Sequence, residues 1–213
     1  MKSNIKSLLA EYCKRKSEIR RRLKEFSAVH KEGDDRVFEE LCFCLMTANA
    51  NALKCDEAIR DLRSSGLIRK GSFSQIWPKL RGRVRFHNNK ARYICGARDL
   101  FTDGGRIKVA LDLKDVISAR DWLVDNVKGL GYKEASHFLR NIGFGNDIAI
   151  LDRHILKNLK RYGVINEIPD SVGSRKIYTA IEDKMRKFSK DIKIPLPDLD
   201  LLFWSIQTGF VFK

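Results

Sequence analysis

The chain has 213 residues, and its 42 lysines and arginines against 27 aspartates and glutamates give a formal net charge of +15 at pH 7. Apolar residues make up 43% of the sequence, enough to fold one large domain or two small lobes. A charge so far from zero favours a polyanionic partner, most simply nucleic acid. No stretch approaches the run of about 18 apolar residues that a membrane helix needs.

The N-terminal residues are densely charged and lack the apolar core of a signal peptide, so we expect an intracellular protein. The five cysteines are an odd number without the spacing of a disulfide framework. Cys42 and Cys44 lie one residue apart and would point about 200° apart on a helix, which favours core packing over metal binding. We therefore expect no metal site and no cofactor.

Apolar residues recur at helical spacing along nearly the whole chain, which predicts an all-α fold with short connections. The predicted helices, in chain order, cover residues 38–66 with a possible break at "TANAN", then 89–101, 116–127, 134–143, 153–163 and 175–188. The best strand candidate, residues 105–113, is weak. Pro169, Pro195 and Pro197 predict loops between the last helices.

Two basic runs, residues 14–24 and 80–93, have a simple interpretation as solvated helix faces. The second run is more suggestive, because several arginines surround Phe86. Cations with an aromatic side chain among them can hold phosphates and stack a base.

The stretch "VKGLGYKEASHFL", residues 127–139, interrupts a helical pattern with two glycines. Gly129 and Gly131 allow a tight hairpin, with one helix ending near Val127 and a second beginning at about Tyr132. The first turn of that second helix offers free backbone N–H groups, a natural phosphate site. This layout is typical of a helix-hairpin-helix element that holds DNA by its backbone. A glycine-rich turn between two packed helices is the alternative.

Lys133 lies where the helix dipole disfavours a cation, and the same field favours the neutral, nucleophilic amine. Its alternative role is a phosphate contact. Asp152 follows an apolar run and precedes a new helix, a position typical of an N-cap. A capping aspartate is held rigidly, so Asp152 can also serve as a catalyst.

The residues "GLGYKEASHFLRN" and "AILDRHI" resemble the helix-hairpin-helix, Gly/Pro-Asp superfamily of DNA glycosylases, most closely its archaeal-type 8-oxoguanine DNA glycosylase/AP lyases. The segments "ELCFCLMTANANA", "RFHNNKARYI" and "DLDLLFWSIQTGFVFK" extend the resemblance over most of the chain. No cysteine follows Cys95, which argues against the iron–sulfur branch of endonuclease III. The stretch before Asp152, "GFGNDIAI", departs from the family pattern in having no proline.

The resemblance implies two helical lobes, residues 1–213 as one glycosylase unit, with the hairpin element at about 116–141 and the active-site cleft between the lobes. It implies a bifunctional enzyme that excises 8-oxoguanine from double-stranded DNA through a lysine Schiff base and then cleaves the abasic site. A monomer in the cytoplasm, associated with the nucleoid through DNA, is expected. Its catalytic residues would be Lys133 as the nucleophile and Asp152 as the group that stabilises cationic character at the sugar.

The remaining implied roles concern the flipped nucleotide. Asn49 would fill the gap that the base leaves, and Phe86 and Trp204 would line the base pocket. His154 would lie near the phosphate of the lesion, and Gly129 and Gly131 would contact the DNA backbone. The alternative for Trp204 is core packing. The alternative for Asn49 is the role of a polar residue that ends a helix. In the resembled family the C-terminal lysine, here Lys213, recognises the base, and we expect the apolar segment "FVF" to pack inward and carry Lys213 with it.

Two other functions stay open at the level of the sequence. The first is a non-catalytic helix-hairpin-helix module that grips DNA or RNA backbone. The second is a glycosylase of the same chemistry that acts on oxidised pyrimidines.

Overall fold

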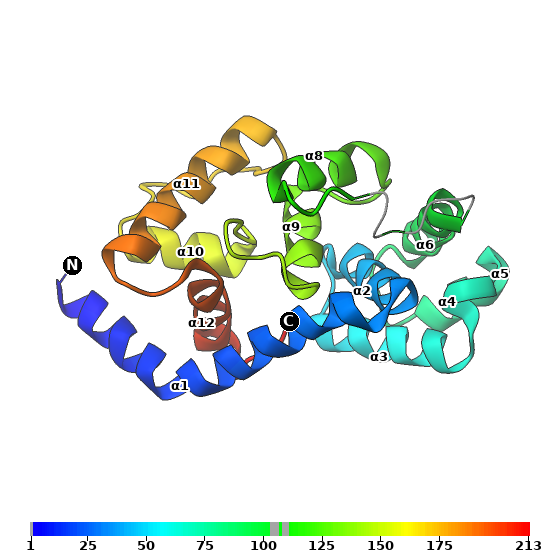
Figure 1. Ribbon diagram of the computed structural model, residues 1–213, viewed down its shortest axis with the longest axis horizontal. Helices are drawn as coiled ribbons and strands as arrows, with labels where there is room; N and C mark the ends of the chain where they lie inside the picture. The colour runs from blue at the N-terminus through cyan, green and yellow to red at the C-terminus, as the bar shows by residue number, and fades with distance from the viewer. Residues whose placement is uncertain (1, 103–106, 108–110) are drawn as a thin grey trace.

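The computed structural model describes residues 2–102, 107 and 111–213. Every regular element in that part of the chain is helical, which confirms the predicted all-α fold (Figure 1). The elements are α1 (Lys2–Val29), η1 (His30–Glu32), α2 (Asp34–Thr47), α3 (Ala52–Ser64), α4 (Leu67–Lys70), α5 (Phe73–Leu80), α6 (His87–Thr102), α8 (Val116–Asn126), α9 (Tyr132–Asn141), α10 (Arg153–Arg161), α11 (Arg175–Asp191) and α12 (Leu196–Thr208). The weak strand candidate at 105–113 lies largely outside the described residues.

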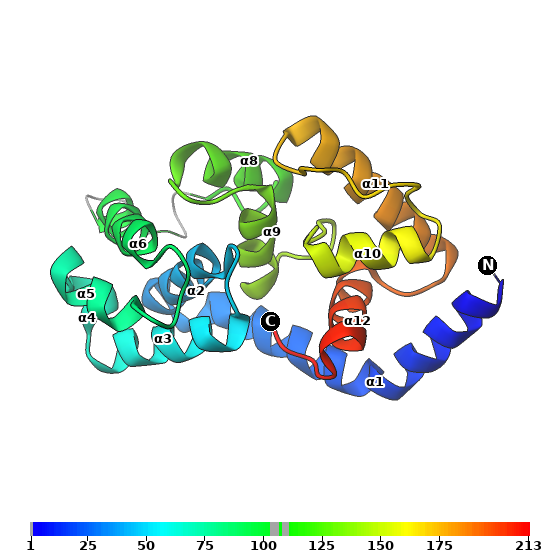
Figure 2. The same ribbon diagram turned by 180° about the vertical axis from the view of Figure 1, so that it is seen from behind.

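The buried side chains form two clusters, and each cluster is the core of one lobe. The first lies among α2 to α6, α8 and most of α9, and the second among α1, α10, α11 and α12. Figures 1 and 2 show α9 standing between the two groups of helices. Tyr132, at the start of α9, belongs to the second cluster, whereas Phe138 belongs to the first. The two-lobed arrangement expected from the resemblance is therefore present.

The break predicted at "TANAN" separates α2 from α3. Asn51 caps α3, because its side-chain oxygen accepts from the backbone N–H groups of Leu53 (3.0 Å) and Lys54 (3.1 Å). Asn49 adopts a left-handed backbone with φ 53°. The polar residues of this turn end one helix and begin the next.

A buried lysine, Lys90, forms hydrogen bonds to the backbone at the end of α2 and stabilises the turn before α3. Lys90 is 3% exposed, and its Nζ donates to the carbonyl oxygens of Met46 and Ala48, both at 2.6 Å. Burial, helped by the charge of Lys133, lowers the pKa of Lys90 to about 8. The last carbonyls of α2 are thereby satisfied by a side chain from α6.

The hairpin between α8 and α9 depends on Gly129. Its φ is 98°, and a Cβ atom there would lie 2.3 Å from Cδ2 of Tyr93. Gly131 has an extended backbone (φ −100°) and is the residue before α9, which begins at Tyr132 as predicted. Only Gly129 is therefore required to be glycine by its backbone conformation.

A buried ion pair joins α8 to α11. Arg120 is fully buried, and its guanidinium donates to both carboxylate oxygens of Glu182, at 2.6 and 3.0 Å. A further hydrogen bond reaches the Ser136 hydroxyl on α9 at 3.2 Å. This network fixes the hairpin helices against the second lobe.

Several smaller predictions can be compared with the helices. Cys42 and Cys44 are both buried in the first cluster, which confirms core packing. Pro195 precedes α12, but Pro197 lies within its first turn, so the prediction of a loop at Pro197 is wrong. A proline is tolerated there because the first backbone N–H groups of a helix have no partner inside the helix. None of the helices among the described residues is long and apolar enough to cross a membrane.

The basic run on α1 is largely a solvated face. Glu11 pairs with Lys14 and Arg15, and Glu25 pairs with Arg21 and Arg22. The ordinary interpretation of that run is confirmed.

Candidate active site

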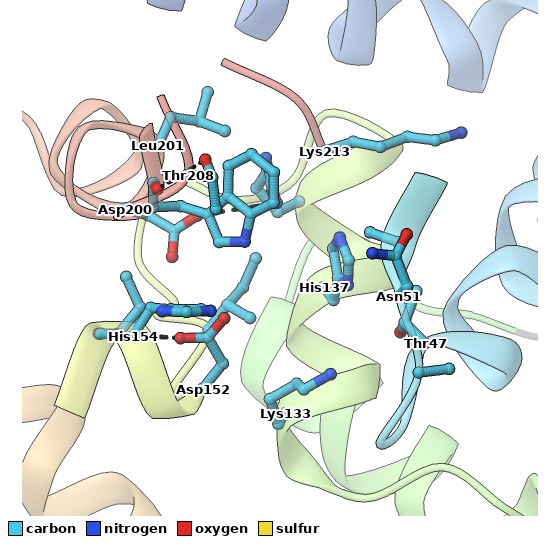
Figure 3. Close-up of a pocket in the computed structure, with 16 residues that line it drawn as sticks. Thr47, Asn51, Lys133, His137, Asp152, His154, Asp200, Leu201, Thr208 and Lys213 are labelled. Atoms are coloured by element: carbon cyan, nitrogen blue, oxygen red, sulfur yellow. Dashed lines mark hydrogen bonds and ion pairs between the residues drawn. The ribbon is translucent and has the colours of Figure 1, made fainter. Parts of the chain in front are cut away.

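A pocket of about 240 Å³ lies where the two lobes meet. This is below the range of about 300–1,000 Å³ typical of drug-sized ligands, and it suits a single planar group. Its walls come from the turn before α3 and from α9, α10, α12 and the C-terminal segment (Figure 3). The lining residues are Thr47, Ala50, Asn51, Ala52, Lys133, His137, Arg140, Ile150, Asp152, His154, Ile155, Asp200, Leu201, Trp204, Thr208 and Lys213.

Lys133 lies in the first turn of α9 and reaches the pocket from below in Figure 3. Its Nζ is 3.1 Å from Oε1 of Glu134, and its side chain is 22% exposed. The amine is therefore accessible from the pocket and has one carboxylate beside it.

Asp152 is the N-cap of α10 and faces the same pocket. Its Oδ1 accepts from the Ile155 N–H at 2.8 Å, so the predicted cap is present. The cap bond uses Oδ1 and fixes the side chain, so Oδ2 is left for chemistry. His154, in the same first turn, also lines the pocket, and its buried Nδ1 has no partner within the described residues.

Lys213 reaches across the pocket to the first lobe. Its Nζ lies 3.0 Å from Asp56, 3.4 Å from Glu40 and 4.1 Å from the centroid of the Phe43 ring. Burial alone would raise the pKa of Asp56, but the charges of Lys213 and Arg60 outweigh it and leave that pKa lowered. The side chain of Lys213 is thus held by two carboxylates and an aromatic face.

The residues before Lys213 pack as expected, with one exception. Trp204 lies edge-on to Phe210 (centroids 5.3 Å apart) and tilted against Phe212 (6.2 Å). Phe212 packs against the first cluster and Val211 against the second. Phe210 stays 39% exposed, so the prediction that the whole "FVF" segment points inward is wrong for this residue. Gly209 has φ 91° and turns the chain after α12, which leaves the Phe210 ring on the surface.

The structure brings five of the predicted site residues together: Lys133, Asp152, His154, Trp204 and Lys213 line one pocket. Asn49 is exposed in the turn beside the lining residues Ala50 and Asn51.

The other predicted residues lie away from the pocket. Phe86 is 54% exposed just before α6, where its φ of 56° turns the ring to the surface with Arg85 stacked on it at 5.2 Å. The expectation that Phe86 lines the pocket is therefore not met in this structure. Gly129 and Gly131 belong to the hairpin loop and are not among the lining residues.

Sequence reasoning missed three ionisable lining residues, His137, Arg140 and Asp200. His137 lies one helical turn after Lys133, is 6% exposed, and has the main chain of Lys213 beside its ring. Burial, together with the charges of Arg140, Lys133 and Lys213, lowers its pKa well below the usual value, so the imidazole is neutral. A neutral imidazole offers one donor and one acceptor to a ligand.

Asp200 and Arg140 are the other two. Burial raises the pKa of Asp200 to about 7 against the opposing charge of Arg140, which lies 3.7 Å away, and the charge of Asp152 contributes to the rise. The position of Lys133 four residues earlier on the same helix could have indicated His137. No comparable local signal marks Asp200 or Arg140.

The chain is similar to known proteins along nearly its whole length. A sequence model of the family described as 8-oxoguanine DNA glycosylase matches residues 19–194. The 8-oxoguanine DNA glycosylase/AP lyase of Fusobacterium nucleatum is 42% identical over 207 residues, which cover 95% of this chain and 94% of the relative.

Two solved structures are similar over the whole fold. The 8-oxoguanine DNA glycosylase of Thermotoga maritima has a TM-score of 0.89 and 33% identity, with 100% of both chains covered. The 8-oxoguanine glycosylase/lyase of Methanocaldococcus jannaschii, in complex with 15mer DNA containing 8-oxoguanine, has a TM-score of 0.90 and 34% identity, with 99% of this chain and 100% of that chain covered.

Proposed function

Because the chain belongs to the 8-oxoguanine DNA glycosylase family of helix-hairpin-helix proteins, we propose that it excises 8-oxoguanine from double-stranded DNA and then cleaves the abasic site by β-elimination. The observation that carries this proposal is the meeting of Lys133 and Asp152, from different helices, in one base-sized pocket.

Lys133, deprotonated with the help of Asp152, attacks C1′ of the flipped nucleotide through Nζ. The C1′–N9 bond breaks as the new C1′–N bond forms, and the departing base takes up a proton. The C1′–O4′ bond then breaks, O4′ takes up the proton that the amine nitrogen gives up, and a C1′=N Schiff base to Lys133 remains. Removal of a proton from C2′ then expels the 3′ phosphate, and water releases the lysine.

Asp152 has two parts in this chemistry. Its carboxylate stabilises the positive charge that develops on the sugar as the base leaves, and it assists deprotonation of the Lys133 amine. Both depend on a fixed carboxylate, and the cap bond to Ile155 supports that fixed position.

The base must leave the stack to reach the pocket. Trp204 and the neutral imidazole of His137 would contact the flipped purine, since both line the pocket. Asn49, exposed on the adjacent turn, would fill the gap in the duplex, and Phe86 would meet the DNA from the surface. His154 and the hairpin glycines Gly129 and Gly131 would lie against phosphates. The protein would act as a monomer on chromosomal DNA inside the cell.

The test is borohydride trapping on a set of duplexes. Radiolabelled duplexes with 8-oxoguanine, an oxidised pyrimidine or no lesion are incubated with the protein and borohydride, and covalent adducts are separated on a denaturing gel. We expect an adduct with 8-oxoguanine and strand cleavage without borohydride. Adducts confined to the oxidised pyrimidine would favour that alternative, and binding without any adduct would favour the non-catalytic module.

A further inference from the structure

One face of α10 consists of cations only. The helix sequence RHILKNLKR contains no acidic residue, and its four exposed cations are Arg153, Lys157, Lys160 and Arg161. At about 100° per residue, these four positions fall within an arc of about 100°. The buried residues Ile155, Leu156 and Leu159 occupy the opposite side and pack into the second lobe. We call the four cations the α10 basic face.

The α10 basic face has no counter-charge within the described part of the chain. None of the four cations is within ion-pair distance of a carboxylate there. Arg161 instead lies over the Tyr162 ring, 5.8 Å from its centroid. Lys157 is one turn from Arg153 and from Arg161, so like charges face each other along the helix. Such neighbours destabilise a helix unless something else neutralises them.

This face starts at the pocket and leads away from it. Asp152, His154 and Ile155, in the first turn of α10, all line the pocket. Figure 2 shows α10 running from α9 towards the far end of the second lobe. From Arg153 to Arg161 the helix rises about 12 Å, which matches three to four phosphates of one strand at about 3.4 Å of duplex axis each.

The helix α3, which starts on the opposite side of the pocket, differs from α10 in the pairing of its charges. α3 begins at Ala52, which also lines the pocket, but its arginines are paired with carboxylates. Arg60 lies 2.6 Å from Asp56, and Arg63 lies 3.3 Å from Glu39. The cations on the exposed face of α10 are therefore unpaired, whereas the arginines of α3, on the other side of the pocket, are neutralised by carboxylates.

We propose that the α10 basic face binds the phosphate backbone of duplex DNA on one flank of the lesion, so that the footprint extends further on that side. The proposal rests on the proposed function, which supplies double-stranded DNA as the ligand. The contact is made by charge and carries no sequence preference, as phosphate contacts do.

The test compares two triple variants with equal loss of charge. The first is Lys157→Gln/Lys160→Gln/Arg161→Gln, and glutamine keeps the helix propensity of these exposed positions. The matched control is Lys6→Gln/Lys14→Gln/Lys24→Gln on α1, which contributes no residue to the pocket. A third variant, Lys157→Arg/Lys160→Arg, keeps the charge. Affinity for a duplex with a non-cleavable abasic analogue is measured by fluorescence anisotropy between 50 and 200 mM salt, about the range over which phosphate contacts are screened.

We expect the α10 triple variant to bind roughly tenfold more weakly and its salt dependence to be shallower by about 2 to 3 in the log–log slope. The arginine variant should bind like the wild type, and the α1 control should keep its slope. Shortening the duplex from one end should weaken the wild type but not the α10 variant, and shortening from the other end should weaken both alike.

Two results would overturn the proposal. If the α10 and α1 triple variants lose equal affinity, the effect follows net charge and not the α10 face. If the α10 variant responds to both shortened duplexes as the wild type does, α10 does not bind a flank. Failure of the wild-type protein to bind any duplex would instead refute the proposed function.

Discussion

Lys133 lines the pocket and its amine is accessible there, which is the arrangement that a lysine nucleophile needs. We predict that Lys133→Gln lowers base release and borohydride trapping by several orders of magnitude, because no other amine is proposed to attack C1′. Duplex affinity should fall by less than about tenfold, since one phosphate-contacting charge at most is removed. Trapping on 8-oxoguanine duplexes and anisotropy on a non-cleavable duplex measure the two effects.

The matched control for that prediction is Lys128→Gln. Lys128 is exposed in the hairpin loop and does not line the pocket, so its loss removes the same charge from the same element. It should trap at wild-type yield. Near wild-type trapping by Lys133→Gln would show that the nucleophile lies elsewhere.

Asp152 has a capping role and a proposed catalytic role, and two substitutions separate them. Asp152→Asn should keep stability within about 1 kcal/mol, because asparagine caps helices as well as aspartate does. Asp152→Ala should lose about 1 kcal/mol of stability through the missing cap. Both should slow single-turnover excision strongly, since neither carries the carboxylate. Full activity in Asp152→Asn would leave the residue with the cap alone.

Asp200 predicts a pH dependence of stability with a definite sign. Its pKa is raised by burial from 3.8 to about 7, so the folded state holds this proton more tightly than the unfolded chain. The stabilisation is complete below about pH 4 and is lost as pH rises through about 7. Urea unfolding should therefore show Asp200→Asn gaining stability relative to the wild type between pH 5 and pH 8, by on the order of 1 to 3 kcal/mol.

The control for the pH prediction is Asp183→Asn, an aspartate on α11 whose side chain is 69% exposed. The stability difference between this variant and the wild type should be almost constant over the same pH range. A constant difference for Asp200→Asn as well would contradict the raised pKa.

At the scale of elements, the hairpin makes different demands on its two glycines. Gly129→Ala places a side chain at φ 98° and a Cβ atom 2.3 Å from the Tyr93 ring, so we expect a loss of at least about 1 to 3 kcal/mol of stability. Gly131→Ala meets only Glu134 Oε2 at 3.3 Å, and its φ of −100° suits alanine, so its stability should change little. Thermal melting of the two variants tests this difference.

The effect of these two substitutions on DNA binding should differ from their effect on stability. A methyl group at Gly131 would stand in the space through which the proposed phosphate approaches the first turn of α9. We therefore expect Gly131→Ala to weaken duplex binding although it melts like the wild type. If neither glycine variant changes binding, the hairpin is only a turn between packed helices.

The elements that the sequence predicted well are those with local signals. The glycine pair, the aspartate before α10 and the polar "TANAN" turn each determine their structure within a few residues, because caps and turns depend on neighbouring backbone groups. Asp200 and Lys213 are different. Lys213 meets Glu40 across 173 residues of sequence, and a contact of that kind follows only from how the lobes pack. Phe86 has a different reason for lying away from the pocket: its backbone is left-handed (φ 56°), and a bulky residue gives no local sequence signal for that conformation.

At the scale of the molecule, the C-terminal segment connects the lobes across the pocket. It leaves α12 in the second lobe and ends with Lys213 between Asp56 and Glu40 of the first. Glu40 is itself 1% exposed and accepts from Asn141 on α9 at 2.7 Å. The side chain of Lys213 therefore holds the main chain of this residue beside His137, and both residues line the pocket.

This arrangement gives a prediction about lesion choice. 8-Oxoguanine carries an N7–H donor where guanine has a lone pair. A hydrogen-bond acceptor fixed opposite N7 therefore binds 8-oxoguanine and repels guanine. A site built to accept a hydrogen bond rejects the analogue without the donor by up to about 10⁴-fold, far more than apolar contacts can. We expect the main-chain oxygen atoms of Lys213 to be that acceptor, and deletion of Lys213 should therefore reduce excision of 8-oxoguanine by at least about a hundredfold.

Strand cleavage at a preformed abasic site separates recognition from chemistry, because that substrate has no base to recognise. The Lys213 deletion should keep this lyase activity within a fewfold of the wild type, and its melting temperature should fall only by the loss of the ion pairs to Asp56 and Glu40. Lys213→Met serves as the matched control, because it removes those ion pairs but keeps a main-chain oxygen at residue 213. It should retain more excision than the deletion at similar stability. Unchanged excision by a well-folded Lys213 deletion would mean that the segment only packs the lobes together and that another group selects the base.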